Sequence, residues 1–376
     1  RMTYKETLFF VAKCLTINHE AHNKRIVEQA LQSNTINWDE VVKLSTAHYV
    51  FPALYCNLKR ASFLSYLPEE LVEYMKYITD LNRERNEQII AQAKELNTLL
   101  LEHNITPIFI KGTGNLLEGL YEDIAERMVG DIDFICSKKD IFKTVKILQS
   151  LEYFSDIELK YLFPGLKHYP RLKNHSKIAA VEIHQQLMKI GKYDYEFNYN
   201  FIKRDLQTID KTNVLSFKNQ LSLSIIATQI NDLGFKHKSL ALRNAYDVFL
   251  LSKKTEAKNA FKEFSSLQHP LNCFLASCYE VFNKPKTLEY ILSKKTEKYL
   301  NLFHKYTNNR ELAEKIFIRN LEKKINKNKK ILLFQYWVVL IWRSFFDKEC
   351  RIWIFERITD KNWQKEKLIQ LGLKKP

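Results

Sequence analysis

The stretch Arg127–Cys136, "RMVGDIDFIC", places two aspartates one residue apart in an otherwise apolar run that follows a glycine. Alternation of Asp131 and Asp133 with apolar residues predicts a strand, in which residues two apart point to the same face with Cα atoms roughly 7 Å apart. Two unpaired carboxylates this close would repel each other and desolvate poorly, so a cation should lie between them. The alternative is a strand end at which the aspartates cap a loop or pair with lysines.

A third acid lies in a later apolar segment. Glu182 is the one acid inside "AAVEIH", part of a strand predicted at 177–184. On a strand beside Asp131 and Asp133 it would complete a cluster of three carboxylates, and Mg²⁺ accepts carboxylates together with substrate phosphates. Taken alone, Glu182 fits an edge-strand glutamate, and His184 two residues later fits either a structural residue or one that orders the carboxylate.

A glycine-containing turn precedes both strands. The segment "IFIKGTG" (108–114) ends a predicted strand with Lys111, Gly112 and Thr113, and a helix over "NLLEGLY" follows. Backbone N–H groups at such a helix start favour phosphate, Lys111 would neutralise a triphosphate, and Thr113 offers a hydroxyl. A lone turn of this kind also fits an ordinary connection between a strand and a helix.

Composition and periodicity indicate a folded, helix-rich chain around this small sheet. The 376 residues suffice for two or three domains, and 45% hydrophobic content with only 8 Gly and 8 Pro excludes disordered and low-complexity classes. Amphipathic helical patterns fill the first hundred residues and return from about 215. The sequence predicts an α+β fold with an N-terminal helical region at 1–100, a mixed-sheet core at 101–212 and a C-terminal helical region at 213–376.

The order strand, glycine turn, helix, Asp-x-Asp strand and later strand with a third acid is the layout of the nucleotidyltransferase palm. The sequence resembles an uncharacterised bacterial nucleotidyltransferase family related to AbiEii-type enzymes, whose members read roughly LKG, a helix with LY, an Arg, D-[IL]-D and [VI]E[IL]H. The matching residues are "IKGTGNLLEGLY" (110–121), Arg127, "GDIDFIC" (130–136) and "VEIH" (181–184).

The resemblance extends beyond these motifs. "NWDEVVKLSTAHYVFPALYCNL" (37–58) is similar to the family's N-terminal helical region, and "LRNAYDVFLL" (242–251) places Asp247 on a matching aspartate. Where the family often has a histidine in the preceding helix, this chain offers Gln229.

The resemblance implies Mg²⁺-dependent transfer of a nucleoside monophosphate from a nucleoside triphosphate such as ATP to a hydroxyl acceptor, with release of pyrophosphate. Two Mg²⁺ ions, or Mn²⁺ in their place, would bridge the phosphates and the attacking hydroxyl. The catalytic and metal-binding residues expected are Asp131, Asp133 and Glu182; the nucleotide-binding residues expected are Lys111, Gly112, Thr113, Arg127 and Gly130. For Arg127 the alternative is a salt bridge to Glu122, Asp123 or Glu126.

The acceptor is open between a small molecule, a protein and RNA. Residues 281–376 hold 23 Lys and Arg against 10 Asp and Glu, and this basic C-terminal region would suit a nucleic acid, as in an RNA- or tRNA-directed, toxin-like transferase. It also fits a solvated helical face. A third interpretation is a non-catalytic nucleotide-binding protein with the same fold.

The cysteines and the apolar segments indicate in which cellular compartment the protein is expected. The six cysteines lack paired spacing and lie among apolar neighbours, which predicts reduced core residues in a cytoplasmic protein. An apolar run of only five residues before Lys13 predicts no secretory signal. The most apolar segment, 331–342, is too short to span a bilayer and predicts a buried or interfacial helix rather than a transmembrane one.

Overall fold

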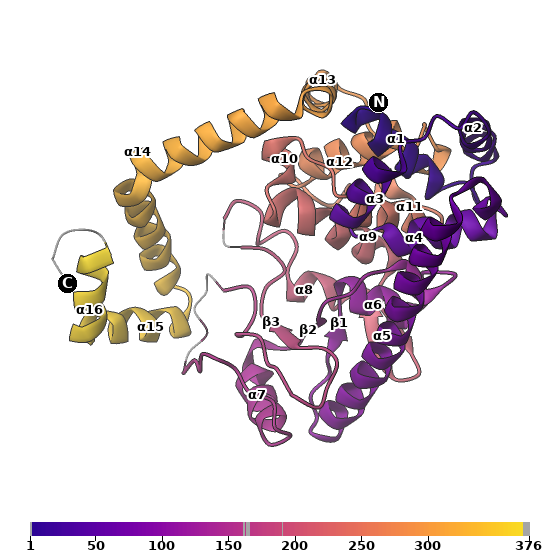
Figure 1. Cartoon of the computed structure of the whole chain (residues 1–376). Helices are drawn as coiled ribbons and strands as arrows, with labels where there is room; N and C mark the ends of the chain where they lie inside the picture. The colour runs from indigo at the N-terminus through magenta and orange to yellow at the C-terminus, as the bar shows by residue number, and fades with distance from the viewer. Residues whose placement is uncertain (1, 161, 163–165, 190, 371–376) are drawn as a thin grey trace. The chain divides into compact units, whose positions relative to one another are not determined.

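The computed structural model describes residues 2–160, 162, 166–189 and 191–370, with the side chains of 323–336 and 366–370 left out (Figure 1). The predicted α+β class is confirmed: helices surround a single five-stranded mixed sheet within this part of the chain. The chain forms two compact units, one made of Arg1–Asp156 with Lys167–Asn308 and the other of Ile157–Leu166 with Asn309–Pro376. The sheet belongs to the first.

The sheet has the strand order β3-β2-β1-β5-β4. Its strands are β1 (Ile108–Phe109), β2 (Ile132–Ile135), β3 (Val181–His184), β4 (Leu206–Ile209) and β5 (Thr212–Leu215). The β2–β3 and β1–β5 pairs are parallel, and the β1–β2 and β4–β5 pairs are antiparallel. The predicted strands correspond to β1, β2 and β3, each shorter than its apolar run.

The β4–β5 hairpin was not predicted. Its two turn residues, Asp210 and Lys211, both have positive φ, at 47° and 65°. Left-handed pairs in hairpins are ordinarily marked by Asn-Gly or Asp-Gly. Because this turn contains no glycine, the sequence carries no such signal.

Five helices precede β1: α1 (Tyr4–Cys14), α2 (Ala21–Gln32), α3 (Trp38–Ala47), α4 (Phe51–Arg60) and α5 (Glu69–Glu102). The first begins with a capping box, in which Thr3 and Glu6 bond each other's backbone N–H. The last begins after Pro68 with two glutamates, which favour the positive end of the helix dipole. The predicted helical character of this region is confirmed.

Helix α5 contacts the rest of the sheet-bearing unit through polar residues as well as its apolar stripe. Asn82, Asn86, Gln92 and Asn97 are all buried. Their amides donate to backbone carbonyls of the segment before β2, of Ala179 before β3 and of the β4–β5 turn. Apolar periodicity in the sequence does not reveal these polar residues. They nevertheless donate hydrogen bonds to backbone carbonyls that are not paired within the sheet.

The remaining helices of the first unit follow β1 in chain order. They are α6 (Lys111–Glu118), α7 (Ile141–Gln149), α8 (Tyr199–Ile202), α9 (Phe217–Ile226), α10 (Gly234–His237), α11 (Leu242–Leu251), α12 (Gln268–Val281) and α13 (Lys294–Asn308). Helices α9 and α11 pack together, and α9 continues into a π-helical turn, Ala227–Asn231. All six cysteines of the chain are buried, which confirms that they are core residues.

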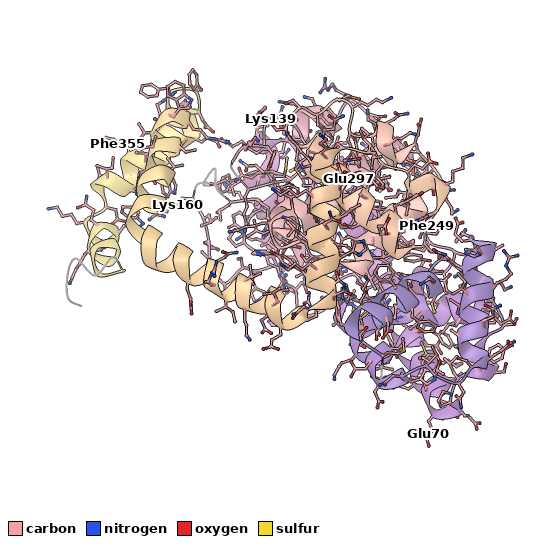
Figure 2. The ribbon with its side chains drawn as sticks, turned by 90° about the horizontal axis from the view of Figure 1, so that it is seen from above. Glu70, Lys139, Lys160, Phe249, Glu297 and Phe355 are labelled. Atoms are coloured by element: carbon pink, nitrogen blue, oxygen red, sulfur yellow. The ribbon has the colours of Figure 1, made fainter. Side chains whose placement is uncertain are left out.

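The second unit consists mainly of α14 (Arg310–Ser344), α15 (Lys348–Thr359) and α16 (Lys361–Gln370). The apolar segment 331–342 lies within α14; Leu340 is buried, whereas Trp342 is 67% exposed. Phe355 on α15, labelled in Figure 2, is also largely exposed. No helix among the described residues is long and apolar enough to cross a membrane. The side chains of 323–330, a lysine-rich part of the basic C-terminal region, lie outside the described residues.

Candidate active site

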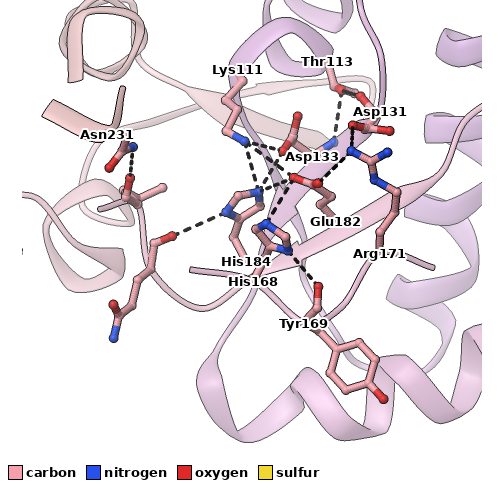
Figure 3. A network of polar contacts seen from close by, with 12 residues as sticks. Lys111, Thr113, Asp131, Asp133, His168, Tyr169, Arg171, Glu182, His184 and Asn231 are labelled. Carbon is pink, nitrogen blue, oxygen red and sulfur yellow. Dashed lines mark hydrogen bonds and ion pairs between the residues drawn. The ribbon is translucent and has the colours of Figure 1, made fainter. Parts of the chain in front are cut away.

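The β2–β3 pairing brings the two central acids together. These strands run parallel with Asp133 opposite Glu182, whereas Phe134 and Ile183 on the other face are fully buried. Asp133 and Glu182 are themselves only 8% and 9% exposed. Their carboxylate oxygens and the imidazole of His184 lie within 4.8 Å of one another (Figure 3). The strand register therefore builds a compact cluster of three side chains that could hold a metal ion.

Lys111 offsets part of the negative charge of this cluster. Its Nζ lies 2.6 Å from Asp133 Oδ1, 3.8 Å from Glu182 Oε2 and 3.3 Å from His184 Nε2. Burial by itself would raise the pKa of Asp133, but Lys111 and the hydrogen bond with His184 outweigh it and hold that pKa well below its usual range. The pKa of Glu182 is lowered against burial too, chiefly by His184, whose Nε2 lies 3.6 Å from Glu182 Oε2. Both acids are therefore ionised at neutral pH.

Asp131 joins the cluster through an arginine. It lies directly before β2, and its Oδ2 accepts a hydrogen bond of 2.8 Å from Nη2 of Arg171, which also lies 3.4 Å from Glu182 Oε1 (Figure 3). Burial, followed by the charges of Glu182 and Asp133, raises the pKa of Asp131, while Arg171 opposes the rise. The three predicted acids are thus brought to one place, with Lys111 and Arg171 among them.

Arg171 was missed from the sequence. It belongs to the turn-rich segment before β3, which contains no strand periodicity. The segment is held to the sheet by an antiparallel bridge between Leu172 and Val181 and by backbone bonds between Phe154 and Lys173. Only the tertiary path of the segment brings Arg171 to the acids, so no spacing in the sequence could have revealed it.

The glycine turn differs from its prediction, since α6 already begins at Lys111 and the "KGTG" residues form its first turns. Lys111 itself has φ 56°, an uncommon left-handed conformation for a side-chain-bearing residue. Thr113 Oγ1 donates to the carbonyl of Asp131 at 3.0 Å and accepts from the N–H of Asp133 at 3.2 Å. The hydroxyl predicted to bind nucleotide therefore ties the start of α6 to β2.

Arg127 forms none of the three salt bridges considered from the sequence. It is 6% exposed, and its Nε lies 3.0 Å from Oδ2 of Asp247, a fully buried residue of α11. Asp247 also accepts a 2.6 Å hydrogen bond from the hydroxyl of Tyr121. Within the described residues, no hydrogen bond or ion pair joins Arg127 to the three acids. Its partner Asp247 is the aspartate noted from the sequence in "LRNAYDVFLL".

Arg127 nevertheless lies against the turn that carries Lys111. A Cβ added at Gly112 would stand 3.5 Å from Arg127 Cζ and 2.9 Å from Val129 Cγ2. Glycine is needed at 112 because the arginine and the valine fill the space that a side chain would occupy. The buried Arg127–Asp247 pair thus connects α11 to the first turn of α6.

The other residues singled out from the sequence take structural positions. Gly130 offers its carbonyl to Arg85 at 2.9 Å, and a Cβ added there would meet no atom within 4 Å. Gln229 is buried, and its Nε2 donates to the carbonyl of Pro270. This side chain is occupied in packing.

Residues 34–282 match the model of a family described as "Uncharacterised nucleotidyltransferase". Among solved structures, JHP933 from Helicobacter pylori is similar at 16% identity, with 64% of this chain and 97% of that chain covered and a TM-score of 0.31. A putative nucleotidyltransferase from H. pylori is similar at 17% identity, with coverages of 63% and 96% and a TM-score of 0.32. No curated protein matches, and the relation to AbiEii-type enzymes stays a prediction. Because the family match spans two thirds of the chain and includes the three acids and Lys111, the chain belongs to this uncharacterised nucleotidyltransferase family.

Proposed function

We propose that this protein transfers a nucleoside monophosphate from a nucleoside triphosphate to a hydroxyl acceptor in a divalent-metal-dependent reaction that releases pyrophosphate. The observation that carries the proposal is the in-register pairing of Asp133 with Glu182 on adjacent parallel strands, with Asp131 and Lys111 beside them. Family membership supports nucleotidyl transfer in general.

The acids fit a divalent metal. Asp131, Asp133 and Glu182 offer carboxylate oxygens, the donors that Mg²⁺ and Mn²⁺ accept, and two buried ionised carboxylates face each other across β2 and β3. These three residues would hold the two ions expected from the sequence. When bound, the metal would offset phosphate charge and favour ionisation of the acceptor hydroxyl.

The first turn of α6 would hold the β- and γ-phosphates. Helix starts present unpaired N–H groups and the positive end of the dipole, which favour anions. The left-handed conformation of Lys111, followed by the helical Gly112, places successive N–H groups as in an anion-binding nest. In this proposal Lys111 supplies charge, Gly112 allows Arg127 and Val129 to pack against the turn, and Arg127 keeps the turn in position.

Arg171 is the residue best placed to bind the α-phosphate. Its side chain is 49% exposed at the rim of the cluster, with Nη2 shared between Asp131 and Glu182. As the acceptor oxygen forms its bond to the α-phosphorus, the bond from phosphorus to the bridging oxygen breaks and pyrophosphate leaves. Glu182 would take the acceptor's proton, and Arg171 would stabilise the charge that develops on the α-phosphate oxygens.

Incubation with labelled nucleoside triphosphates, Mg²⁺ or Mn²⁺ and a cell extract tests the proposal and identifies the acceptor as a small molecule, a protein or RNA. Asp133→Asn is expected to abolish labelling while the protein stays folded. Asp210→Asn, a matched change in the exposed turn between β4 and β5, should label normally. Near-normal labelling by Asp133→Asn would overturn the catalytic assignment. Thermal stabilisation by nucleotide and metal without any transfer would indicate a non-catalytic nucleotide-binding protein instead.

A further inference from the structure

Two imidazoles face the paired acids. His184, the last residue of β3, has Nε2 at 2.7 Å from Asp133 Oδ1 and 3.6 Å from Glu182 Oε2. His168, in the turn-rich segment before β3, has Nε2 at 3.7 Å from the same Glu182 oxygen. The two ring centroids are 5.1 Å apart (Figure 3). Nitrogen as well as oxygen donors therefore surround Glu182.

Hydrogen-bond partners determine which ring nitrogen carries the proton. Nδ1 of His168 lies 2.8 Å from the carbonyl oxygen of Tyr169, which only accepts, so Nδ1 is the donor and Nε2 of the neutral ring carries a lone pair that faces Glu182. Nε2 of His184 lies 2.7 Å from Asp133 Oδ1, and because a carboxylate oxygen only accepts, Nε2–H is the donor of this hydrogen bond. A metal ion bound here would take the place of that proton.

The lone pair of His168 Nε2 and the ionised carboxylate of Glu182, 3.7 Å apart, repel each other unless a cation lies between them. Histidines that bind metals show this arrangement, with one nitrogen directed at the ion and the other held by a carbonyl or a carboxylate. Lys111 Nζ lies 3.3 Å from His184 Nε2 and 2.6 Å from Asp133 Oδ1, so positive charge already lies at this place. The geometry is that of a nitrogen- and oxygen-lined cation site.

We infer that His184 and His168 are metal ligands together with Asp133 and Glu182, and that this mixed set selects a first-row transition ion, Mn²⁺, over Mg²⁺. The inference deepens the proposed function and rests on it for the role of the metal. Mg²⁺ takes oxygen ligands almost alone, carboxylates suit Mn²⁺, and imidazole suits first-row transition ions. Donors to one ion lie up to about 4.4 Å apart at ordinary bond lengths. The 4.8 Å cluster of Asp133, Glu182 and His184 needs only a small adjustment to reach that spacing. His168 lies outside that cluster and approaches it at Glu182, with its Nε2 3.7 Å from Oε2.

Pulsed electron paramagnetic resonance of the full chain, with Mn²⁺ at half the protein concentration, tests the inference without any assay of activity. Wild-type protein should show histidine ¹⁴N coupling to Mn²⁺, and growth on ¹⁵N-histidine should replace it by ¹⁵N coupling. Competition with Mg²⁺ should show Mn²⁺ bound at least about tenfold more tightly, the order expected of a site with imidazole ligands. Bound Mn²⁺ without nitrogen coupling, or equal affinities for the two ions, would overturn the inference.

Variants assign the coupling to residues. His168→Gln should reduce the nitrogen coupling, and His22→Gln, an exposed position on α2, should leave it unchanged. A coupling that survives intact in His168→Gln would remove that residue from the ligand set. Since His184 is 1% exposed and its replacement can impair folding, the isotope experiment on wild-type protein tests it instead.

A non-hydrolysable nucleoside triphosphate separates this inference from the proposed function. Phosphorus coupling to the same Mn²⁺ supports nucleotide binding at the site, whereas nitrogen coupling supports the histidine ligands. Nitrogen without phosphorus coupling would retain the metal site and remove the proposed substrate. Phosphorus coupling without nitrogen coupling would retain the proposed substrate and remove the histidines from the ligand set.

Discussion

Replacing Asp247 by asparagine is expected to destabilise the sheet-bearing unit by about 3–5 kcal/mol, the usual loss when one partner of a buried ion pair is removed. Asp247 is fully buried, Arg127 is 6% exposed, and their closest contact is 3.0 Å. Asparagine can still accept a hydrogen bond but cannot neutralise the guanidinium. The arginine would then remain as an unpaired charge in the core.

Two further variants provide a comparison for this loss of stability. Tyr121→Phe removes the 2.6 Å hydrogen bond to Asp247 but leaves both charges, so about 1.5–3 kcal/mol is expected. The double variant Arg127→Met/Asp247→Leu removes both charges and fills a similar volume, and it should recover most of the stability lost in Asp247→Asn. The expected order is therefore Asp247→Asn least stable, with the other two closer to wild type.

Urea unfolding followed by hydrogen exchange in β2 and α11 is the suitable assay. Four of the five tryptophans lie at 337–363, in the other compact unit, so fluorescence would report mainly on that unit. A loss below about 1 kcal/mol in Asp247→Asn, which is typical of surface ion pairs, would refute the reasoning. The double variant also tests Arg127: retained stabilisation by nucleotide would show that the arginine does not itself bind the nucleotide.

Gly114→Ala should destabilise the protein by about 1–3 kcal/mol in urea unfolding, because the new Cβ would stand 2.7 Å from the carbonyl oxygen of Phe109. Gly130→Ala, where no atom lies within 4 Å, should stay within about 0.5 kcal/mol of wild type, and equal losses in the two would contradict this reasoning. Burial raises the pKa of Asp123, but hydrogen bonds from Arg83 outweigh it and lower the pKa below its ordinary 3.8. The stability that Asp123 contributes is thus fully present above pH 3.8 and lost as the pH falls below it, so the stability difference between wild type and Asp123→Asn should shrink there. A difference that grows on acidification, measured by hydrogen exchange at pH 5 and pH 3.5, would contradict the assignment.

The strands that carry the site were predictable because their apolar alternation is local. Asp133 and Glu182 each stand out as an acid within a buried strand, and the resemblance supplied the idea that the two strands meet. Their register is a different matter, since nothing in the sequence indicates that residue 133 lies opposite 182 rather than one position away. A shift by one residue would have turned Glu182 to the other face.

The residues that sequence reasoning missed reach the site through irregular chain. Arg171 and His168 lie in a segment without period, and only its bridges to β3 bring them to Glu182. The salt bridges considered for Arg127 as the alternative to nucleotide binding were to acids nearby in the sequence, whereas its partner Asp247 is 120 residues away. Local patterns indicate which residues can be functional, and long-range packing decides which of them meet.

The fold depends on the rotational position of the residues around the axis of helix α5. Over its 34 residues, or about 51 Å, the amides from Asn82 to Asn97 meet carbonyls of three separate loops. One residue inserted between Asn82 and Gln92 would rotate everything beyond it by about 100° and carry Gln92 and Asn97 away from those carbonyls. Substitutions on the exposed side of α5 would leave these bonds in place, so the helix should tolerate many changes of residue and almost no change of length.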